Sequence, residues 1–144
     1  MRLYKLCFIV LILTFLLTFF TINTPAVTNS DLPWNWVKVG LKDEDIMFGV
    51  GTRNPNLGDN IGLEFGTTYK NKNFSPELDL LYFFDPSDSF SLNVGIGVFV
   101  DNNGVSTKYS TAYSGGIWFH LANTVMGVGY NSCSGITLRC GLWF

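Results

Sequence analysis

Residues 134–144 read "SGITLRCGLWF" and place an apolar side chain at every second position. The alternating residues are Ile136, Leu138, Cys140, Leu142 and Phe144. A period of two is typical of a β-strand with two different faces. No polar tail follows Phe144. We therefore expect the chain to end within a strand whose apolar face is covered by something other than water.

The composition indicates a folded domain that is poor in charge. The chain has 144 residues, of which 47% are hydrophobic and 16% aromatic, and this content argues against disorder. Only 14% of the residues are charged, whereas ordinary soluble domains contain about 25%. The formal net charge is -2 and the isoelectric point is near 5.1. No basic surface is expected, so nucleic acid is not a predicted partner.

The first residues have the layout of a secretory signal peptide. "MRLYKLCFIVLILTFLLTFF" has a basic start and an apolar run from Leu6 to Phe20, and the next residues offer Ala26 or Ser30 as a small residue before a cleavage point. We predict a signal peptide over residues 1–26 and one domain over residues 27–144. An uncleaved anchor is the alternative, although about 18 or more apolar residues are normally needed to span a bilayer.

The rest of the chain alternates between strand and turn patterns. The expected strands are Trp34 to Leu41, whose status is open, Ile46 to Arg53, Asn60 to Lys70, Pro76 to Phe84, Ser89 to Val100, Val105 to Leu121, Thr124 to Asn131 and Gly135 to Phe144. The expected turns are "KDED", "NPNLGD", "NKNFS", "DPSD", "DNNG", "AN" and "SCS". These turns are rich in the Asn, Asp, Gly, Pro and Ser residues that supply turn conformations.

The two faces of these strands differ in size and polarity. Large apolar residues on one face include Leu63, Phe65, Leu78, Leu80, Tyr82, Val94, Ile96, Ile117, Phe119 and Val128. The other face carries Gly62, Glu64, Gly66, Asp79, Asn93, Gly95, Gly97, Lys108, Ser114, Gly116, Trp118, His120, Gly127, Gly129, Thr137, Arg139 and Gly141. The two faces therefore need two different surroundings.

The glycine-rich face indicates which side of the sheet points outward. Glycine weakens a strand and suits a water-facing surface poorly. A closed barrel of about eight strands has a lumen just wide enough for small side chains and a few paired polar ones, and a closed barrel is one of only two ways to span a bilayer. We predict an all-β, closed, antiparallel, up-and-down transmembrane barrel. The alternative is a secreted soluble β-barrel that binds an apolar ligand inside.

"GITLRCGLWF", together with the signal-peptide pattern and the hairpin series, resembles the small eight-stranded bacterial outer-membrane β-barrels. The resemblance implies a location in the cell outer membrane, with outer-membrane lipids and lipopolysaccharide as partners. It also implies that the barrel-assembly machinery recognises the C-terminal strand signature, which consists of Ile136, Leu138, Leu142 and Phe144. We expect a monomer without an open pore that serves the envelope structurally or through weak contacts at its outer loops.

The same resemblance implies that both chain termini lie on the periplasmic side. "KDED", "NKNFS", "DNNG" and "SCS" would then lie outside the cell, and "NPNLGD", "DPSD" and "AN" would lie in the periplasm. Members that bind hosts or ligands often carry long outer loops. All loops expected here are short, which does not favour an adhesion function.

Charged and polar side chains on the inward face predict a polar network in the lumen. The set is Glu64, Asp79, Lys108, His120 and Arg139. Buried charges are costly unless they are paired, so we expect Arg139 to pair with Glu64 or Asp79 across the lumen. Eight strands leave no room for an open aqueous channel, and we interpret the network as a plug rather than an ion path.

Catalytic and metal-binding signals are absent from the sequence. His120 is the single histidine, and Ser114 on the same face lies six residues away, too far along one strand for a nucleophile and base pair. "GVGYNSCSGI" is faintly similar to lipid A deacylase barrels, in which a His stands two residues before a catalytic Ser, but here Tyr130 stands two before Ser132. A lipid A-modifying hydrolase is thus a third alternative. We expect no enzymatic activity, no metal and no cofactor.

Cysteine spacing predicts free thiols. Cys133 lies in the expected last turn and Cys140 lies in the middle of the last strand. At about 3.3 Å per residue the two are about 20 Å apart, whereas a disulfide tolerates about 7 Å between Cα atoms.

Overall fold

The computed structural model describes residues 33–43, 45–70, 73–87, 89–102, 104–121 and 124–143. Its elements are β1 (Trp34–Lys42), β2 (Asp45–Arg53), the short 3-10 helix η1 (Pro55–Leu57), β3 (Ile61–Lys70), β4 (Asn73–Ser87), β5 (Phe90–Asn102), β6 (Thr107–Leu121), β7 (Thr124–Asn131) and β8 (Gly135–Trp143). The predicted signal peptide and Phe144 lie outside the described residues. Within the described ranges, no helix has the length and apolar character needed to cross a bilayer.

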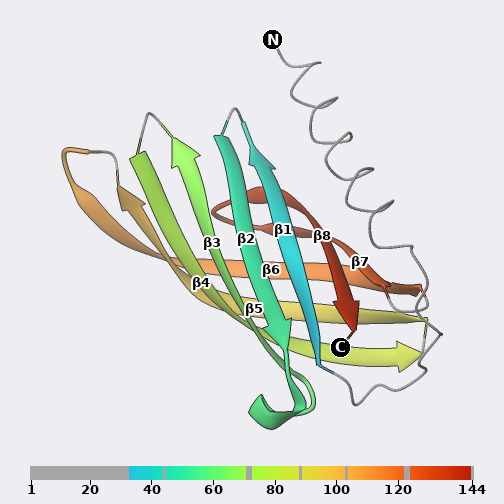
Figure 1. The fold of residues 1–144 in the computed structure, drawn as a ribbon. Helices are drawn as coiled ribbons and strands as arrows, with labels where there is room; N and C mark the ends of the chain where they lie inside the picture. Colours follow the sequence, from blue (N-terminus) through green and yellow to red (C-terminus); the bar gives the residue numbers. More distant parts are fainter. Residues whose placement is uncertain are drawn as a thin grey trace.

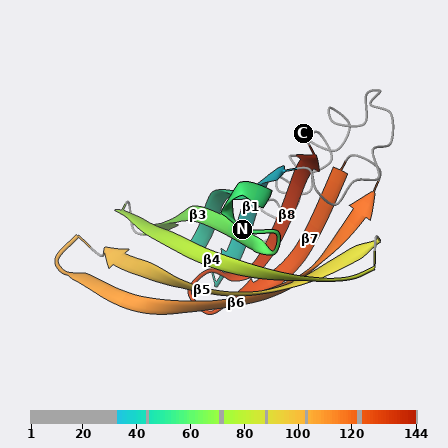
Figure 2. The same ribbon diagram turned by 90° about the horizontal axis from the view of Figure 1, so that it is seen from below.

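The strands form one closed antiparallel barrel. Each strand pairs with the next along the chain, and β1 pairs with β8 from Trp34↔Trp143 to Leu41↔Ile136. Figure 1 shows the β1 and β8 strands side by side, and Figure 2 shows β4, β5 and β6 as one curved wall opposite β1 and β8. The predicted fold class is confirmed, and Trp34–Lys42 is indeed the first strand.

One strand is longer than the sequence indicates. The strand is expected to begin at Pro76, after the expected turn "NKNFS", but β4 begins at Asn73. Residues 73–76 pair with β3 alone, since pairing with β5 starts only at Glu77. A proline is tolerated at such an edge, and Phe74 there packs on Tyr69 with ring centroids 5.1 Å apart.

The hairpin of β5 and β6 extends past the rest of the barrel. β6 pairs with β5 from Thr107 to Phe119, but it pairs with β7 only from Ser114 onward. Residues 107–113 therefore have one neighbouring strand, and Figure 1 shows this hairpin reaching beyond the other strands.

The apolar face of the sheet points outward. Leu80, Ile96 and Phe119 are 49%, 53% and 49% exposed, and many other large apolar side chains share this surface. Gly127, from the small-residue face, is buried in the lumen. The barrel is therefore inside out relative to a water-soluble one, as the glycine pattern predicts.

A cluster of aromatic and aliphatic side chains lies in the lumen, and the sequence analysis placed only one of its members, Trp118, on the inward face. The cluster consists of Trp34, Trp36, Leu81, Phe83, Trp118 and Val125, all buried. We call this set the aromatic plug. Glycines opposite the rings make the space, because a Cβ on Gly51 would overlap the indole of Trp36 and one on Gly127 would lie 2.8 Å from Trp118.

The last turn is held by a side chain that also reaches the lumen. The Asn131 Oδ1 atom accepts hydrogen bonds from the backbone N–H groups of Cys133 (2.8 Å) and Ser134 (3.2 Å). Gly135 follows with a φ of 75°, a conformation that glycine adopts without strain. Cys133 and Cys140 are free thiols, as predicted, and burial raises the pKa of the Cys133 thiol.

The glycine requirement can be tested with two alanine substitutions. Gly51→Ala should lower the free energy of unfolding by about 1–3 kcal/mol, because its methyl group needs the space of the Trp36 ring. Gly115→Ala is the control, since a Cβ there meets only the Asn93 carbonyl at 3.6 Å. Urea unfolding in lipid vesicles, followed by tryptophan fluorescence, measures both. Equal effects of the two substitutions would contradict the packing argument.

Candidate functional site in the barrel lumen

The ammonium group of Lys38 lies at the centre of a buried ion network. Its Nζ atom is 2.5 Å from Glu64 Oε1, 2.9 Å from Glu77 Oε1 and 3.7 Å from Asp79 Oδ2. All four side chains are removed from solvent. Such charges are costly in a barrel interior unless each finds partners of opposite sign, and Lys38 supplies one partner to three carboxylates.

Glu64 receives the most donors in this network. Arg139 donates from Nε to Glu64 Oε2 (2.7 Å) and from Nη2 to Glu64 Oε1 (3.1 Å), a bidentate pair. The indole N–H of Trp36 donates to Glu64 Oε2 at 2.7 Å. Arg139 also donates from Nη1 to the hydroxyl of Thr137 at 2.7 Å. Glu64 thus links both buried cations to the aromatic plug.

Glu77 and Asp79 share the amide of Asn131. The Nδ2 atom of Asn131 donates to Glu77 Oε1 at 3.1 Å and to Asp79 Oδ2 at 3.0 Å. Glu77 Oε2 and Asp79 Oδ1 are buried without a hydrogen-bond partner. The three carboxylates therefore outnumber the two cations, and the excess negative charge lies on the Glu77 and Asp79 side.

The strand register explains how the network forms. The two cations are cross-strand neighbours, Lys38 on β1 and Arg139 on β8, and the anions Glu64 and Asp79 are neighbours on β3 and β4. β2 separates the two groups and presents Gly49 between them, where a Cβ would lie 3.2 Å from Lys38 Cε. The two cations would repel each other on β1 and β8, and the two anions would repel each other on β3 and β4. The ion pairs across the lumen compensate for both repulsions.

The carboxylate cluster also resembles a metal site in its spacing. One oxygen each of Glu64, Glu77 and Asp79 lie within 4.8 Å of one another. However, the Lys38 ammonium already contacts all three side chains. An internal cation therefore takes the position that a metal ion would need.

The aromatic plug lies in the lumen between this network and the rim where β1 begins. The Trp118 ring lies 4.9 Å from Trp36 and 5.1 Å from Trp34, and Trp34 lies 5.2 Å from Phe83. The Arg139 guanidinium stacks on Trp118 from the network side at 5.5 Å. Contacts between tilted rings at these distances are favourable, and the rings pack against one another across the lumen.

A second polar cluster covers the other side of the aromatic plug. Arg53 donates to both carboxylate oxygens of Asp85, at 3.1 Å and 2.6 Å, and its guanidinium lies over Phe83. Ser91 Oγ lies 2.5 Å from Asp85 Oδ1 and 2.8 Å from His120 Nε2. We call this set the rim cluster.

The rim cluster holds a serine beside a histidine, but the hydrogen bonds run the wrong way for a nucleophile. Asp85 is an ionised acceptor because Arg53 pairs with it, so the single hydroxyl proton of Ser91 goes to Asp85. His120 Nε2 must then donate to Ser91 rather than remove its proton. Ser91 is also 0% exposed. The arrangement positions side chains and does not activate the hydroxyl.

The predicted polar set divides into three groups in the structure. Glu64, Asp79 and Arg139 come together in the ion network, and Arg139 pairs with Glu64 rather than Asp79. His120 lies in the rim cluster. Lys108 is exposed, so its assignment to the lumen is wrong. Alternation gives Lys108 an inward position, but this part of β6 lies beyond the rim of the barrel. Lys108 pairs there with Asp101 of β5 and has no partner on β7.

Sequence reasoning missed two central members of the network, Lys38 and Glu77. Both had a signal: Lys38 follows Trp34 and Trp36 at spacings of two, and Glu77 stands two residues before Asp79. The first strand is open to doubt in the sequence analysis, and on the strand expected from Pro76 the inward face was assigned only at Asp79. Ser132, the serine of the hydrolase alternative, accepts a hydrogen bond from the Tyr113 N–H at the rim opposite His120.

Comparisons with known proteins identify the fold alone. No family model and no curated protein sequence matches the chain. A solved structure from the de novo design of transmembrane β-barrels is similar, with a TM-score of 0.59 and 15% sequence identity. The match covers 85% of this chain and 97% of that one. The fold is therefore that of an eight-stranded transmembrane β-barrel.

Two isosteric substitutions test the charge balance of the network. Glu64→Gln should lower the free energy of unfolding by about 3–5 kcal/mol, because Lys38 and Arg139 lose the carboxylate that pairs them both. Asp79→Asn should change stability little, since it removes excess negative charge and keeps an acceptor for Asn131. Unfolding in vesicles at pH 7 compares the two. A larger loss for Asp79→Asn would refute this assignment.

Proposed function

We propose that the protein is a small outer-membrane β-barrel without an open pore, which serves the envelope as a structural component. The observation that carries this proposal is the combination of an outward face of large apolar side chains with a lumen filled by ion pairs and packed rings. A closed sheet of this kind satisfies its backbone hydrogen bonds internally, as hydrocarbon requires.

The outward face is too apolar for water. Its exposed side chains include Phe48, Val50, Phe65, Leu78, Leu80, Val94, Ile96, Val98, Ile117, Phe119 and Val128. Soluble monomers rarely expose contiguous apolar patches larger than a few hundred Å². Because the exposed apolar side chains lie on successive strands, this surface is suited to contact with the hydrocarbon of a bilayer.

The lumen supports the absence of a pore. The ion network, the aromatic plug and the rim cluster follow one another along the axis, and their side chains are mostly buried. The same packing argues against the soluble alternative, because an internal apolar ligand would have to occupy space already taken by Trp34, Trp36 and Trp118.

The location and partners rest on the sequence. The signal-peptide pattern of residues 1–26 and the C-terminal strand signature support export to the outer membrane and recognition by the barrel-assembly machinery. Outer-membrane lipids and lipopolysaccharide would surround the barrel, which we propose to be a monomer with both termini in the periplasm. We also propose that it is not an enzyme, and the direction of the Ser91 hydrogen bonds supports this.

Membrane fractionation and conductance test the proposal together. The full chain, expressed in a Gram-negative host, should appear in the outer-membrane fraction and migrate differently in gels with and without heating. Reconstituted in planar bilayers, it should give no single-channel steps, because the aromatic plug closes the axis. Recovery in the soluble periplasmic fraction would refute the membrane assignment, and regular conductance steps would refute the closed lumen.

A further inference from the structure

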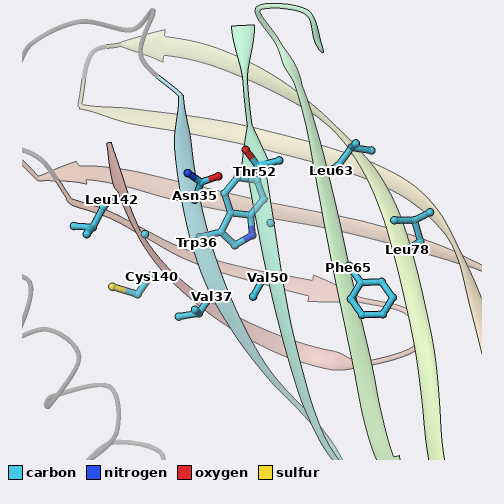
Figure 3. Close-up of a pocket in the computed structure, with 12 residues that line it drawn as sticks. Asn35, Trp36, Val37, Val50, Thr52, Leu63, Phe65, Leu78, Cys140 and Leu142 are labelled. Carbon is cyan, nitrogen blue, oxygen red and sulfur yellow. The ribbon is translucent and has the colours of Figure 1, made fainter. Parts of the chain in front are cut away.

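The outer wall of the barrel carries a groove of about 510 Å³. Its main row crosses four strands through directly paired residues, Val37 on β1, Val50 on β2, Phe65 on β3 and Leu78 on β4. Figure 3 shows these four side chains on successive strands. Cys140 of β8, the partner of Val37, continues the row. The volume falls within the range of about 300–1,000 Å³ that is typical of small-molecule sites.

Side-chain size accounts for the depression. The row begins with the small residues Cys140, Val37 and Val50, whereas the bulky Phe65 and Leu78 stand at its other end. Phe48 lies in the next row toward the opposite rim and is 52% exposed. Small side chains beside larger ones leave a hollow in the outer wall.

Polar atoms stand at one end of the groove only. Asn35 and Thr52, cross-strand partners on β1 and β2, line it on the side of the rim where β1 begins. The walls deeper along the strands are apolar side chains. A ligand that matches this lining has a hydrogen-bonding group near the rim and a hydrocarbon chain that extends toward the middle of the barrel.

Surrounding hydrocarbon must fill such a hollow, because an empty groove would forfeit the dispersion contacts of its walls. The rim with Asn35 is also the rim where β8 ends, since Trp34 pairs with Trp143. If both termini face the periplasm, a ligand with its polar group at this rim belongs to the periplasmic leaflet. That leaflet consists of glycerophospholipids rather than lipopolysaccharide.

We propose that this groove binds one acyl chain of a periplasmic-leaflet glycerophospholipid, with Asn35 and Thr52 donating hydrogen bonds to its ester or phosphate oxygens. The inference rests on the proposed function and deepens it, because it assigns a defined lipid site to one part of the outer wall.

Native mass spectrometry of the full chain in detergent, titrated with phosphatidylethanolamine, tests the site. The wild type should retain one lipid. Val50→Trp fills the middle of the groove and should weaken retention about tenfold, because about two methylene groups lose their buried contacts. Val94→Trp is the matched control: Val94 is an outward valine on β5, 53% exposed against 57% for Val50, and it does not line the groove.

The outcomes separate this inference from the proposed function. Heat-dependent gel migration, measured on the same samples, reports whether each variant is a folded barrel. If folded wild type retains no lipid, or if both tryptophan variants bind equally, the groove assignment is wrong while the membrane barrel stands. Retention of lipopolysaccharide in place of phosphatidylethanolamine would contradict the assignment of the groove to a lipid of the periplasmic leaflet. Lipid binding only after removal of residues 1–26 would assign the groove to the chain's own apolar leader.

Discussion

The pairing of β1 with β8 is the constraint on which the rest of the structure depends. It closes the sheet, so that no strand edge remains within the barrel. Closure also divides the alternating side chains between an enclosed lumen and an outer wall. Once the lumen is enclosed, its contents must fit a narrow space, and most large apolar side chains of the described residues lie outside it.

In the lumen, large side chains pack against glycines on neighbouring strands. Glycines such as Gly51 and Gly127 give the indoles room, and Gly49 lets Lys38 extend beneath β2 toward Glu64. The charges then offset one another across the barrel rather than along the sheet. Because most partners come from non-neighbouring strands, the network also favours one strand register over its alternatives.

Much of the fold follows from the sequence, and the lumen follows only in part. The period-two pattern predicts most of the strands and the inward positions of Glu64 and Arg139, whereas the first strand, left open over Trp34 to Leu41, is settled by the structure as Trp34–Lys42. Alternation gives the face of a residue but not its depth, which is why Lys108 was assigned to the lumen although the β5–β6 hairpin extends past the rim there. The choice of Glu64 over Asp79 as the partner of Arg139 depends on strand stagger, which a local pattern does not contain.

Site-directed spin labelling tests most directly whether the outward side chains meet hydrocarbon. A nitroxide is attached in turn at Leu80, Ile96 and Phe119, in a chain whose native cysteines are replaced by serine, and the protein is folded into lipid vesicles. Collisions with molecular oxygen, which concentrates in hydrocarbon, should exceed those with a water-soluble nickel chelate at all three positions. Greater access for the chelate, or protection from both agents, would mean that these residues face water or a packed core.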